Sequence, residues 1–196
     1  MPNTSATGGY LAPVTTPNSP DDGDLDAVFQ KAIAGITGLP GNMVRPRWQP
    51  VMPKQPEPST NWCAFGVSLQ SVPDQPYIEH DGTGDGIDRL RRHEDILVFC
   101  TFYGPVSGHL ATLFRDGFYV AQNREEIGAA GISLAACGES RAAPELVNQQ
   151  WIKRHDIAAT FRRQVQREYA VRNIVSAEVS LTADAPELVS TINISE

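Results

Sequence analysis

One acidic, glycine-rich stretch could bind a metal ion or a phosphate: DGTGDG, residues 81–86. Its first positions match the start of a calcium-binding loop, in which aspartate and threonine oxygens coordinate the ion. The twelfth position of such a loop requires a bidentate glutamate, but the chain has Arg92 there. The glycines also miss the GxGxxG spacing that brings a backbone close to a pyrophosphate. This stretch therefore predicts a hairpin loop, with no metal and no cofactor.

A histidine beside two carboxylates could transfer protons at His93, Glu94 and Asp95. Successive residues of a strand point to opposite faces, so His93 and Asp95 share a face and Glu94 does not. No GxSxG or HExxH motif accompanies them. We predict no catalytic residue, and a small hydrolase stays an alternative only if a pocket gathers His93, Asp95 and a cysteine. No metal-ligand spacing relates the four histidines, which are His80, His93, His109 and His155.

The three cysteines, Cys63, Cys100 and Cys137, are widely spaced, and none belongs to a CxxC pair. This usage favours reduced, structural cysteines in a cytosolic protein. No apolar run approaches the ~20 residues that a membrane span needs, and the N-terminus has no signal pattern of charged and then apolar residues. We therefore predict no membrane partner.

The overall charge argues against a protein that binds nucleic acid tightly. The formal net charge is −7 over 196 residues, whereas neutralising phosphates requires a net basic surface. Arginine outnumbers lysine thirteen to three, and arginine favours planar, bidentate ion pairs at protein interfaces. This bias is typical of proteins that assemble.

Basic residues nevertheless gather in one stretch. Six of the 16 lysines and arginines fall within 151–172, against two acids, Asp156 and Glu168. Three interpretations stay open: a nucleic-acid face, a solvated strand face, or one side of a subunit interface. The first lacks the interleaved exposed aromatics of single-strand binding surfaces. The six residues are Lys153, Arg154, Arg162, Arg163, Arg167 and Arg172.

Apolar and polar residues alternate in this stretch from Ile157 to Val165. The two-residue period predicts a strand with one buried face, although alanine, arginine and glutamine also favour helix. Arg163 and Arg167 interrupt the apolar row, so the buried face must lose its cover or meet a partner there.

We predict that this basic strand meets acidic residues of a neighbouring copy. A heterologous contact uses two different patches and can close into a ring. Reversing Arg162 and Arg163 to glutamate would then break the ring. The basic side would be Arg154, Arg162, Arg163 and Arg167, and the acidic side Asp21, Asp22, Asp24, Glu125 and Glu126.

The surrounding elements are predicted from hydrophobic periodicity and from the residue types that begin and end helices and strands. Residues 1–20 are rich in Thr, Ser, Pro and Gly and predict an extended N-terminal arm. The clearest helix is capped at Asp21 and ends at Gly38, and a second runs from Ser107 to about Arg115 with Leu113 inward. Strands are predicted at 42–48 (an edge strand), 62–70 (with Leu69 on the apolar face), 77–78, 87–103 (covered on both faces), 132–136, 156–165, 174–181 and 188–194, with a connector containing one helical turn at 143–150.

This order of helices and strands predicts an α+β fold, a mainly antiparallel sheet with helices packed on it. We expect a single domain over 21–196, preceded by the arm over 1–20.

Several stretches together resemble the neck or tail terminator proteins of contractile-tailed bacteriophages and their prophages. The resemblance covers residues 25 to 181 in the same order, and no single piece is specific alone. The stretches are GITGLPGNMVRPRWQP (35–50), NWCAFGV (61–67), EDILVFCTFYGP (94–105), FRDGFYVAQNREEI (114–127) and APELVNQQWIKRHDIAATFRRQVQREY (143–169).

The resemblance implies a structural protein of the virion neck or tail, present in the host cytoplasm during assembly, and not an enzyme. Such proteins form a ring, here expected to be a hexamer, that caps the tail tube, stops its growth and offers a docking surface for head-to-tail joining. The implied partners are further copies of the chain, the tail tube protein, neck or connector proteins and the tail sheath. Genomic DNA would pass through the lumen without sequence-specific binding. A connector, stopper or adaptor role is the alternative.

Overall fold

The computed structural model describes residues 3, 6–15, 20–51, 53–147, 149–174, 176–182 and 189–195, the last two ranges as backbone only. The chain forms two compact units. The helix-bearing unit comprises Asn18–Gln75 and Arg92–Val165, and the hairpin unit comprises Met1–Pro17, Pro76–Arg91 and Gln166–Glu196. This division shows which residues pack together and does not show which parts fold independently. The predicted arm over 1–20 and the predicted single domain over 21–196 therefore stay predictions.

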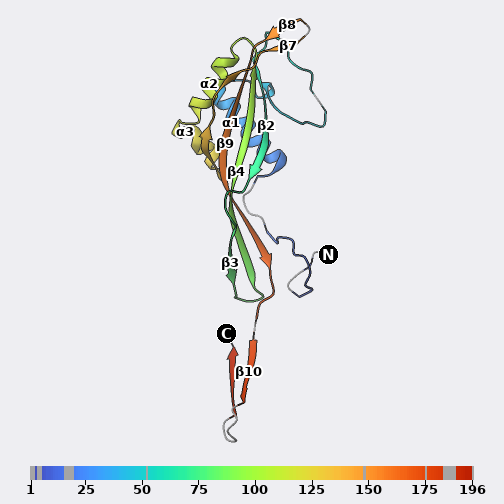
Figure 1. Cartoon of the computed structure of the whole chain (residues 1–196), viewed down its shortest axis with the longest axis vertical. Helices are drawn as coiled ribbons and strands as arrows, with labels where there is room; N and C mark the ends of the chain where they lie inside the picture. The colour runs from blue at the N-terminus through green and yellow to red at the C-terminus, as the bar shows by residue number, and fades with distance from the viewer. Residues whose placement is uncertain are drawn as a thin grey trace. The chain divides into compact units, whose positions relative to one another are not determined.

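The architecture is α+β, as predicted, and its main sheet is mostly antiparallel (Figure 1). The sheet has the order β1-β2-β4-β9-β5, with β3 also paired to β4 and β6 to β9. β1 runs parallel to β2 at one edge, which suits a strand that contains a proline. The strands are β1 (Val44–Pro46), β2 (Trp62–Ser71), β3 (Tyr77–Asp81), β4 (Ile87–Tyr103), β5 (Ile132–Cys137), β6 (Arg141–Ala142) and β9 (Arg154–Ala170).

The predicted helices form, although one cap differs from the prediction. Gly38 ends α1 in the left-handed conformation with φ 72°, and its N–H donates to the last turn. Asp21 precedes α1, but its carboxylate makes no capping bond and pairs with Arg163. The helices are α1 (Asp22–Thr37), α2 (Ser107–Gly117) and α3 (Ala121–Gly128), with a 3₁₀ turn η1 (Gly41–Met43).

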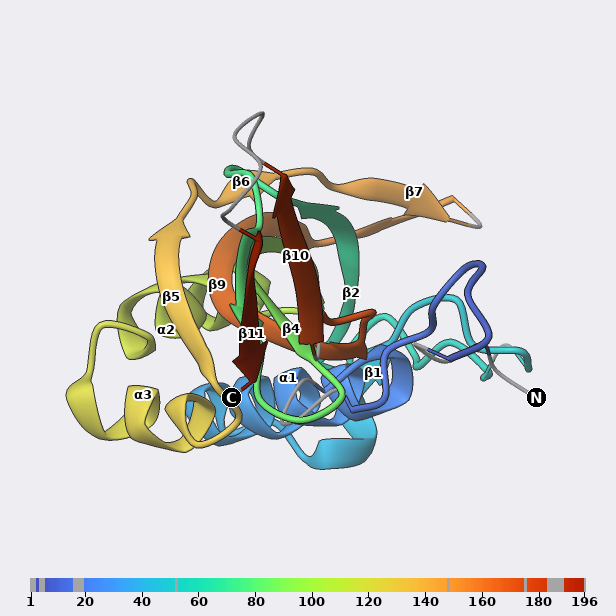
Figure 2. The same cartoon turned by 90° about the horizontal axis from the view of Figure 1, so that it is seen from below.

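The core of the helix-bearing unit lies between the helices and one face of its sheet (Figure 2). Phe29 of α1 lies 4.9 Å from Phe161 of β9, centroid to centroid, and Phe114 of α2 lies 5.8 Å from Phe102 of β4. Every buried apolar side chain among those described belongs to this unit. Apolar burial therefore stabilises the helix-bearing unit far more than the hairpin unit.

Two expected core positions are exposed. A β-bulge between residues 67 and 69 shifts the register of β2, so Leu69 leaves the apolar face and is 55% exposed. Leu113 of α2 is also exposed, because Ala111 takes the inward position. β4 is central, as predicted, but the prediction that both of its faces are covered is wrong. Leu97 and Phe99, on the face away from the core, are only half-buried.

The prediction of a connector with one helical turn at 143–150 is also wrong. The chain forms a two-stranded hairpin there, β7 (Glu145–Val147) with β8 (Gln150–Ile152). Gln149, in the turn, has φ 64°, a left-handed conformation that a helical turn would not contain. Short polar-apolar runs of this kind do not distinguish a helical turn from a short hairpin strand.

The hairpin unit consists of paired strands and part of the N-terminal segment. β3 pairs with residues 87–91 of β4, and β10 (Ser176–Thr182) pairs with β11 (Val189–Ser195) in a separate two-stranded sheet. Thr15 forms an antiparallel bridge with Glu168 of β9. The predicted strands near the C-terminus are thus confirmed, apart from positions that lie outside the described residues.

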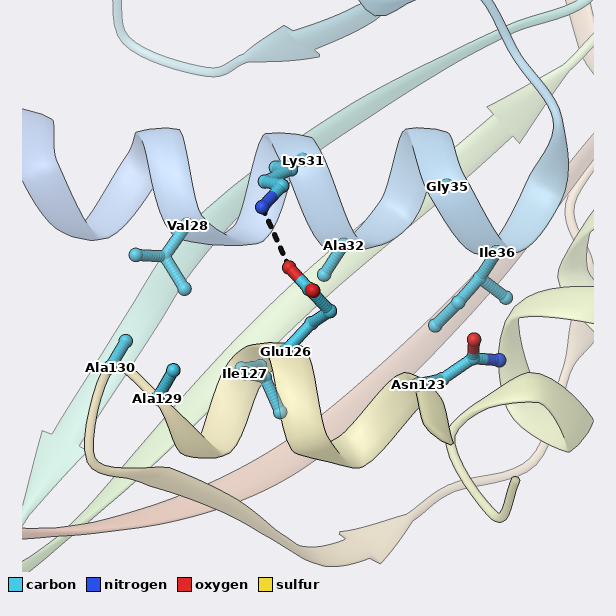
Figure 3. Close-up of a pocket in the computed structure, with 10 residues that line it drawn as sticks. All are labelled: Val28, Lys31, Ala32, Gly35, Ile36, Asn123, Glu126, Ile127, Ala129 and Ala130. Atoms are coloured by element: carbon cyan, nitrogen blue, oxygen red, sulfur yellow. Dashed lines mark hydrogen bonds and ion pairs between the residues drawn. The ribbon is translucent and has the colours of Figure 1, made fainter. Parts of the chain in front are cut away.

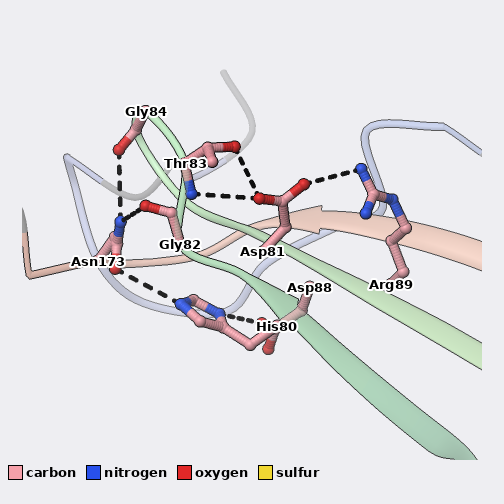
Figure 4. A network of polar contacts seen from close by, with 8 residues as sticks. All are labelled: His80, Asp81, Gly82, Thr83, Gly84, Asp88, Arg89 and Asn173. Carbon is pink, nitrogen blue, oxygen red and sulfur yellow. Dashed lines mark hydrogen bonds and ion pairs between the residues drawn. The ribbon is translucent and has the colours of Figure 1, made fainter. Parts of the chain in front are cut away.

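A polar network closes the β3–β4 loop (Figure 4). His80 Nδ1 lies 2.7 Å from Asp88 Oδ1, and Asn173 donates to the carbonyl of Gly82. The hydrogen bonds with Asp88 and then Asn173 raise the pKa of His80 above its ordinary value. The stretch that resembled a calcium loop is therefore a hairpin loop, as predicted, whose Asp81 accepts hydrogen bonds from Thr83 and Arg89.

Candidate subunit interface

Arg163 is the most buried of the predicted interface arginines, with 4% of its side chain exposed. It lies on the core face of β9 because alternate residues from Ile157 to Val165 point there. Its Nη2 lies 2.8 Å from Glu94 Oε2 and 2.7 Å from Asp21 Oδ1, and Nη1 donates to the carbonyl of Pro20. The interrupted apolar row thus meets a partner, and this partner belongs to the same chain.

Glu94 is the residue of this cluster that the sequence-based prediction missed. It lies on the same face of β4 as the core residues Ile96 and Val98 and is itself buried. A signal was present, because Glu94 interrupts one apolar row as Arg163 interrupts another. Opposite charges in two such rows predict a buried ion pair, since isolated buried charges are very costly.

Arg162 points to the other face of the sheet. Its Nε and Nη2 donate to the two carboxylate oxygens of Asp95 at 2.7 and 3.0 Å, a bidentate pair. This hydrogen bonding holds the pKa of Asp95 below its ordinary value. The Arg162 side chain is 48% exposed, so solvent screens the pair and limits its contribution to stability.

Arg154 is also paired within the chain, at the start of β9. Its Nε and Nη2 donate to the two oxygens of Asp156 at 2.9 and 2.8 Å, and Nη1 reaches Glu145 at 3.1 Å. Its guanidinium lies 5.8 Å from the centre of the Tyr103 ring. Three of the four predicted basic interface residues therefore have acidic partners in their own chain, and their role between subunits stays a prediction.

The other five predicted interface residues make fewer polar contacts with the rest of the described chain than Arg154, Arg162 and Arg163 do. Arg167 is half-buried on β9 and has no ion pair among the described residues. Asp22, Asp24 and Glu125 are exposed, whereas Glu126 accepts a 2.7 Å hydrogen bond from Lys31. This bond lowers the pKa of Glu126. Acids that form no ion pair with any described side chain thus remain at the start of α1 and on α3, where another molecule can meet them.

A groove runs between α1 and α3, with a volume of about 600 Å³ (Figure 3). The ion pair of Lys31 with Glu126 joins the two helices across it and is largely exposed on both sides. Small and aliphatic residues form most of the wall. They are Val28, Ala32, Gly35 and Ile36 from α1, and Ile127, Ala129 and Ala130 from α3 and the residues after it.

An apolar pair projects from the β7–β8 hairpin of the same unit. Leu146 and Trp151 are direct cross-strand partners and are 58% and 69% exposed. Ile152, next in the strand, is buried and anchors the hairpin. The sequence-based prediction missed this feature because it assigned a helical turn to the segment.

The arrangement offers no support for the hydrolase alternative. His93 is exposed and Asp95 is paired with Arg162, whereas Cys63 and Cys100 are buried on the core face of the sheet. Burial, followed by a hydrogen bond with Cys63, raises the pKa of the Cys100 thiol well above its ordinary value. These residues are not gathered in one pocket.

One serine–histidine pair does form, between Ser107 Oγ and His155 Nδ1 at 3.0 Å. Ser107 is fully buried at the start of α2, and a Cβ on Gly108 would lie 3.1 Å from His155 Nε2. Ser107 has no exposed surface of its own, although it lines a pocket together with His155, and we assign the pair to fixing α2 against β9.

Two further properties concern the described residues as a whole. No group of three or more His, Cys, Asp or Glu side chains among them is arranged to hold a metal ion. None of the described helices is long and apolar enough to cross a membrane.

The sequence matches a family model described as phage neck terminator protein over residues 23–184. The match includes the helix-bearing unit almost entirely, together with β3, the whole of β4 and β9, and β10. No curated protein matches the chain.

Proposed function

Because the chain belongs to the phage neck terminator protein family, we propose that it forms a ring that caps the tail tube, ends its growth and receives the head-side connector. The family is one of structural proteins, so the chain is a component of the virion neck. The match over residues 23–184 is the observation on which this proposal rests.

The distribution of charge supports a ring through which DNA passes. The chain has a net charge of −7, and Arg154, Arg162 and Arg163 are neutralised by acids of the same chain. A lumen built from such subunits would not hold phosphates, because strong binding needs unpaired basic side chains. Genomic DNA would then move through it without sequence-specific contact.

The acids that have no ion pair within the described part of the chain support contact between copies. Asp22, Asp24 and Glu125 are exposed on the helices, and Arg167 has no ion pair among the described side chains. In the proposed ring these charges lie at or near subunit contacts. Each contact should bury more than ~1,000 Å² in total if it is stable.

The N-terminal arm and the hairpin unit are the parts that we assign to the tube or the connector. Tyr10 and Val14 of the arm are 96% and 62% exposed, and β10 with β11 forms a two-stranded sheet. Isolated two-stranded hairpins are only marginally stable in water, so a partner surface would stabilise it. Removing residues 1–12 should keep the fold, because the backbone hydrogen bonds to β9 begin at Val14, and should weaken tail joining.

A phage from which this chain is deleted tests the proposal. We expect tails with tubes of uncontrolled length and heads that fail to join them, seen by electron microscopy. Tails of normal length that carry no heads would instead favour the connector, stopper or adaptor role. Infectious virions with normal necks would contradict both.

A further inference from the structure

The apolar pair of the β7–β8 hairpin, Leu146 and Trp151, is an exposed surface of the kind that a partner covers. Leu146 and Trp151 lie side by side across the two strands, and together they present one continuous apolar surface. The hairpin holds them in place, because Ile152 is buried beneath it and Glu145 is paired with Arg154. A tryptophan can bury about 150–250 Å², and aromatic anchors of this kind dominate the energetics of many interfaces.

The groove between α1 and α3 has the complementary form. Most of its wall is apolar and small, although Lys31, Asn123 and Glu126 also line it. Gly35 leaves the backbone of α1 open, since a Cβ there would meet nothing within 4 Å. A volume of about 600 Å³ lies in the range of pockets that take bulky organic groups. No described side chain from elsewhere in the chain lines it.

Charges beside the two surfaces also match. Lys153 follows the hairpin directly, is exposed and has no acidic partner among the described residues. Glu125 lies one turn before Ala129 of the groove wall and is likewise exposed. Residues four apart share a helix face, so Glu125 borders the groove on the side that Ala129 lines.

We propose that each copy inserts Leu146 and Trp151 into the α1–α3 groove of the next copy, with Lys153 placed against Glu125 at its rim. This inference rests on the proposed ring and names its contact. Both surfaces are present on every copy and lie on different elements, so a contact that each copy makes with the next in one direction is heterologous, the type that forms a ring when the rotation closes. The pair supplies the anchor, and surrounding polar surface completes the area that a stable interface needs.

Two variants of the full chain separate the two sides of this contact. The double substitution Leu146→Ala and Trp151→Ala removes the inserted pair and leaves the groove intact. Gly35→Arg places a long side chain on the groove wall and leaves the pair intact, and its Cβ would meet no neighbour within 4 Å. Native mass spectrometry of the wild-type chain should show a ring, and each variant alone should be monomeric.

An equimolar mixture of the two variants gives the decisive result. The Gly35→Arg copy offers an intact pair and the double-alanine copy an intact groove, so heterodimers should form. They should not grow further, because the remaining surfaces are both defective. A contact made by any other surface would give no such restoration.

Two control variants match these changes in residue type. Trp48→Ala removes another tryptophan that is 72% exposed, and Gly41→Arg adds the same charge at a glycine with free space for a Cβ. Both should form rings like the wild-type chain. Circular dichroism melts should show that all four variants are folded.

The outcomes distinguish the contact from the ring. If the wild-type chain forms rings and both groove and hairpin variants do so too, the contact is wrong and the proposed ring stands. If the wild-type chain stays monomeric at high concentration and the variant mixture shows no heterodimer, both proposals are overturned.

Discussion

The two units of the chain are stabilised in different ways. In the helix-bearing unit, rings from α1, β9 and the residue that follows α2 pack against one another. The Phe161 ring lies 4.9 Å from that of Phe29 and 5.0 Å from that of Phe118, centroid to centroid. In the hairpin unit no described apolar side chain is buried. Its strands are joined by backbone pairing and by exposed ion pairs such as Arg91 with Glu79 at 3.5 Å.

This difference indicates a division of roles. Apolar burial is the main source of folding free energy, whereas exposed ion pairs contribute little. We therefore expect the helix-bearing unit to be stable in the free subunit and the hairpin unit to open readily until a partner covers it. Low-stability segments of this kind are typical of regions that bind.

The largest effect should come from the aromatic core. Phe161→Ala should lower the free energy of unfolding by about 3–5 kcal/mol, because it leaves a cavity among rings that cannot fully close. Urea denaturation followed by circular dichroism measures the change. Leu69→Ala, at an exposed position of the same sheet, is the control and should change stability little.

Breaking the buried ion pair should have the next largest effect. Glu94→Ala should cost about 3 kcal/mol, within the range for such pairs, since Arg163 keeps Asp21 and the Pro20 carbonyl as acceptors whereas Arg92 loses its bond to Glu94. The double variant Glu94→Gln with Arg163→Met should recover much of the loss in the same denaturation experiment. If Glu94→Ala were as stable as the wild-type chain, the cluster would not hold the end of the core together.

A smaller and local effect is expected in the hairpin unit from Gly86→Ala. Gly86 has φ 85°, and a Cβ there would lie 2.6 Å from the Asn173 Cβ, so we expect a local cost of about 1–3 kcal/mol. Hydrogen exchange at the amides of β3 should accelerate while global unfolding changes little. Gly84→Ala shares the left-handed conformation but meets no neighbour, and it should accelerate exchange less.

The smallest effect is a pH dependence centred on His80. Its folded pKa lies above the ordinary value because of Asp88 and Asn173. The stabilisation is therefore fully present below the unfolded pKa, near ~6.5, and is lost as the pH rises through the folded pKa. A titration of the His80 ring by NMR should show the raised pKa, and Asp88→Asn should reduce it. A midpoint in the wild-type chain at or below the ordinary value would contradict the network.

Sequence periodicity predicted most elements of the fold, because their burial patterns are regular. The alternation in β9 and the amphipathic α1, which ends at Gly38, were recognisable for this reason. Leu69 escaped prediction because a bulge changes the face of a residue without changing the local pattern. The β7–β8 hairpin escaped because three-residue strands are too short to show a period.

The candidate interface was less predictable than the fold. Charge counts identified Arg163 and Asp21 as partners of opposite charge, but they could not tell whether the partners belong to one chain or to two. That depends on the folded structure, in which Arg163 of β9 pairs with Asp21 before α1 and with Glu94 of β4. The exposure of Trp151 could be recognised only from the structure, which shows that the segment is a hairpin.

Imaging the purified chain together with purified tail tubes tests the central proposal most directly. Negative-stain electron microscopy should show a closed ring of this protein at one end of each tube, and capped tubes should no longer lengthen when tube protein is added. Bare tube ends that continue to grow beside a monomeric protein would contradict the proposal.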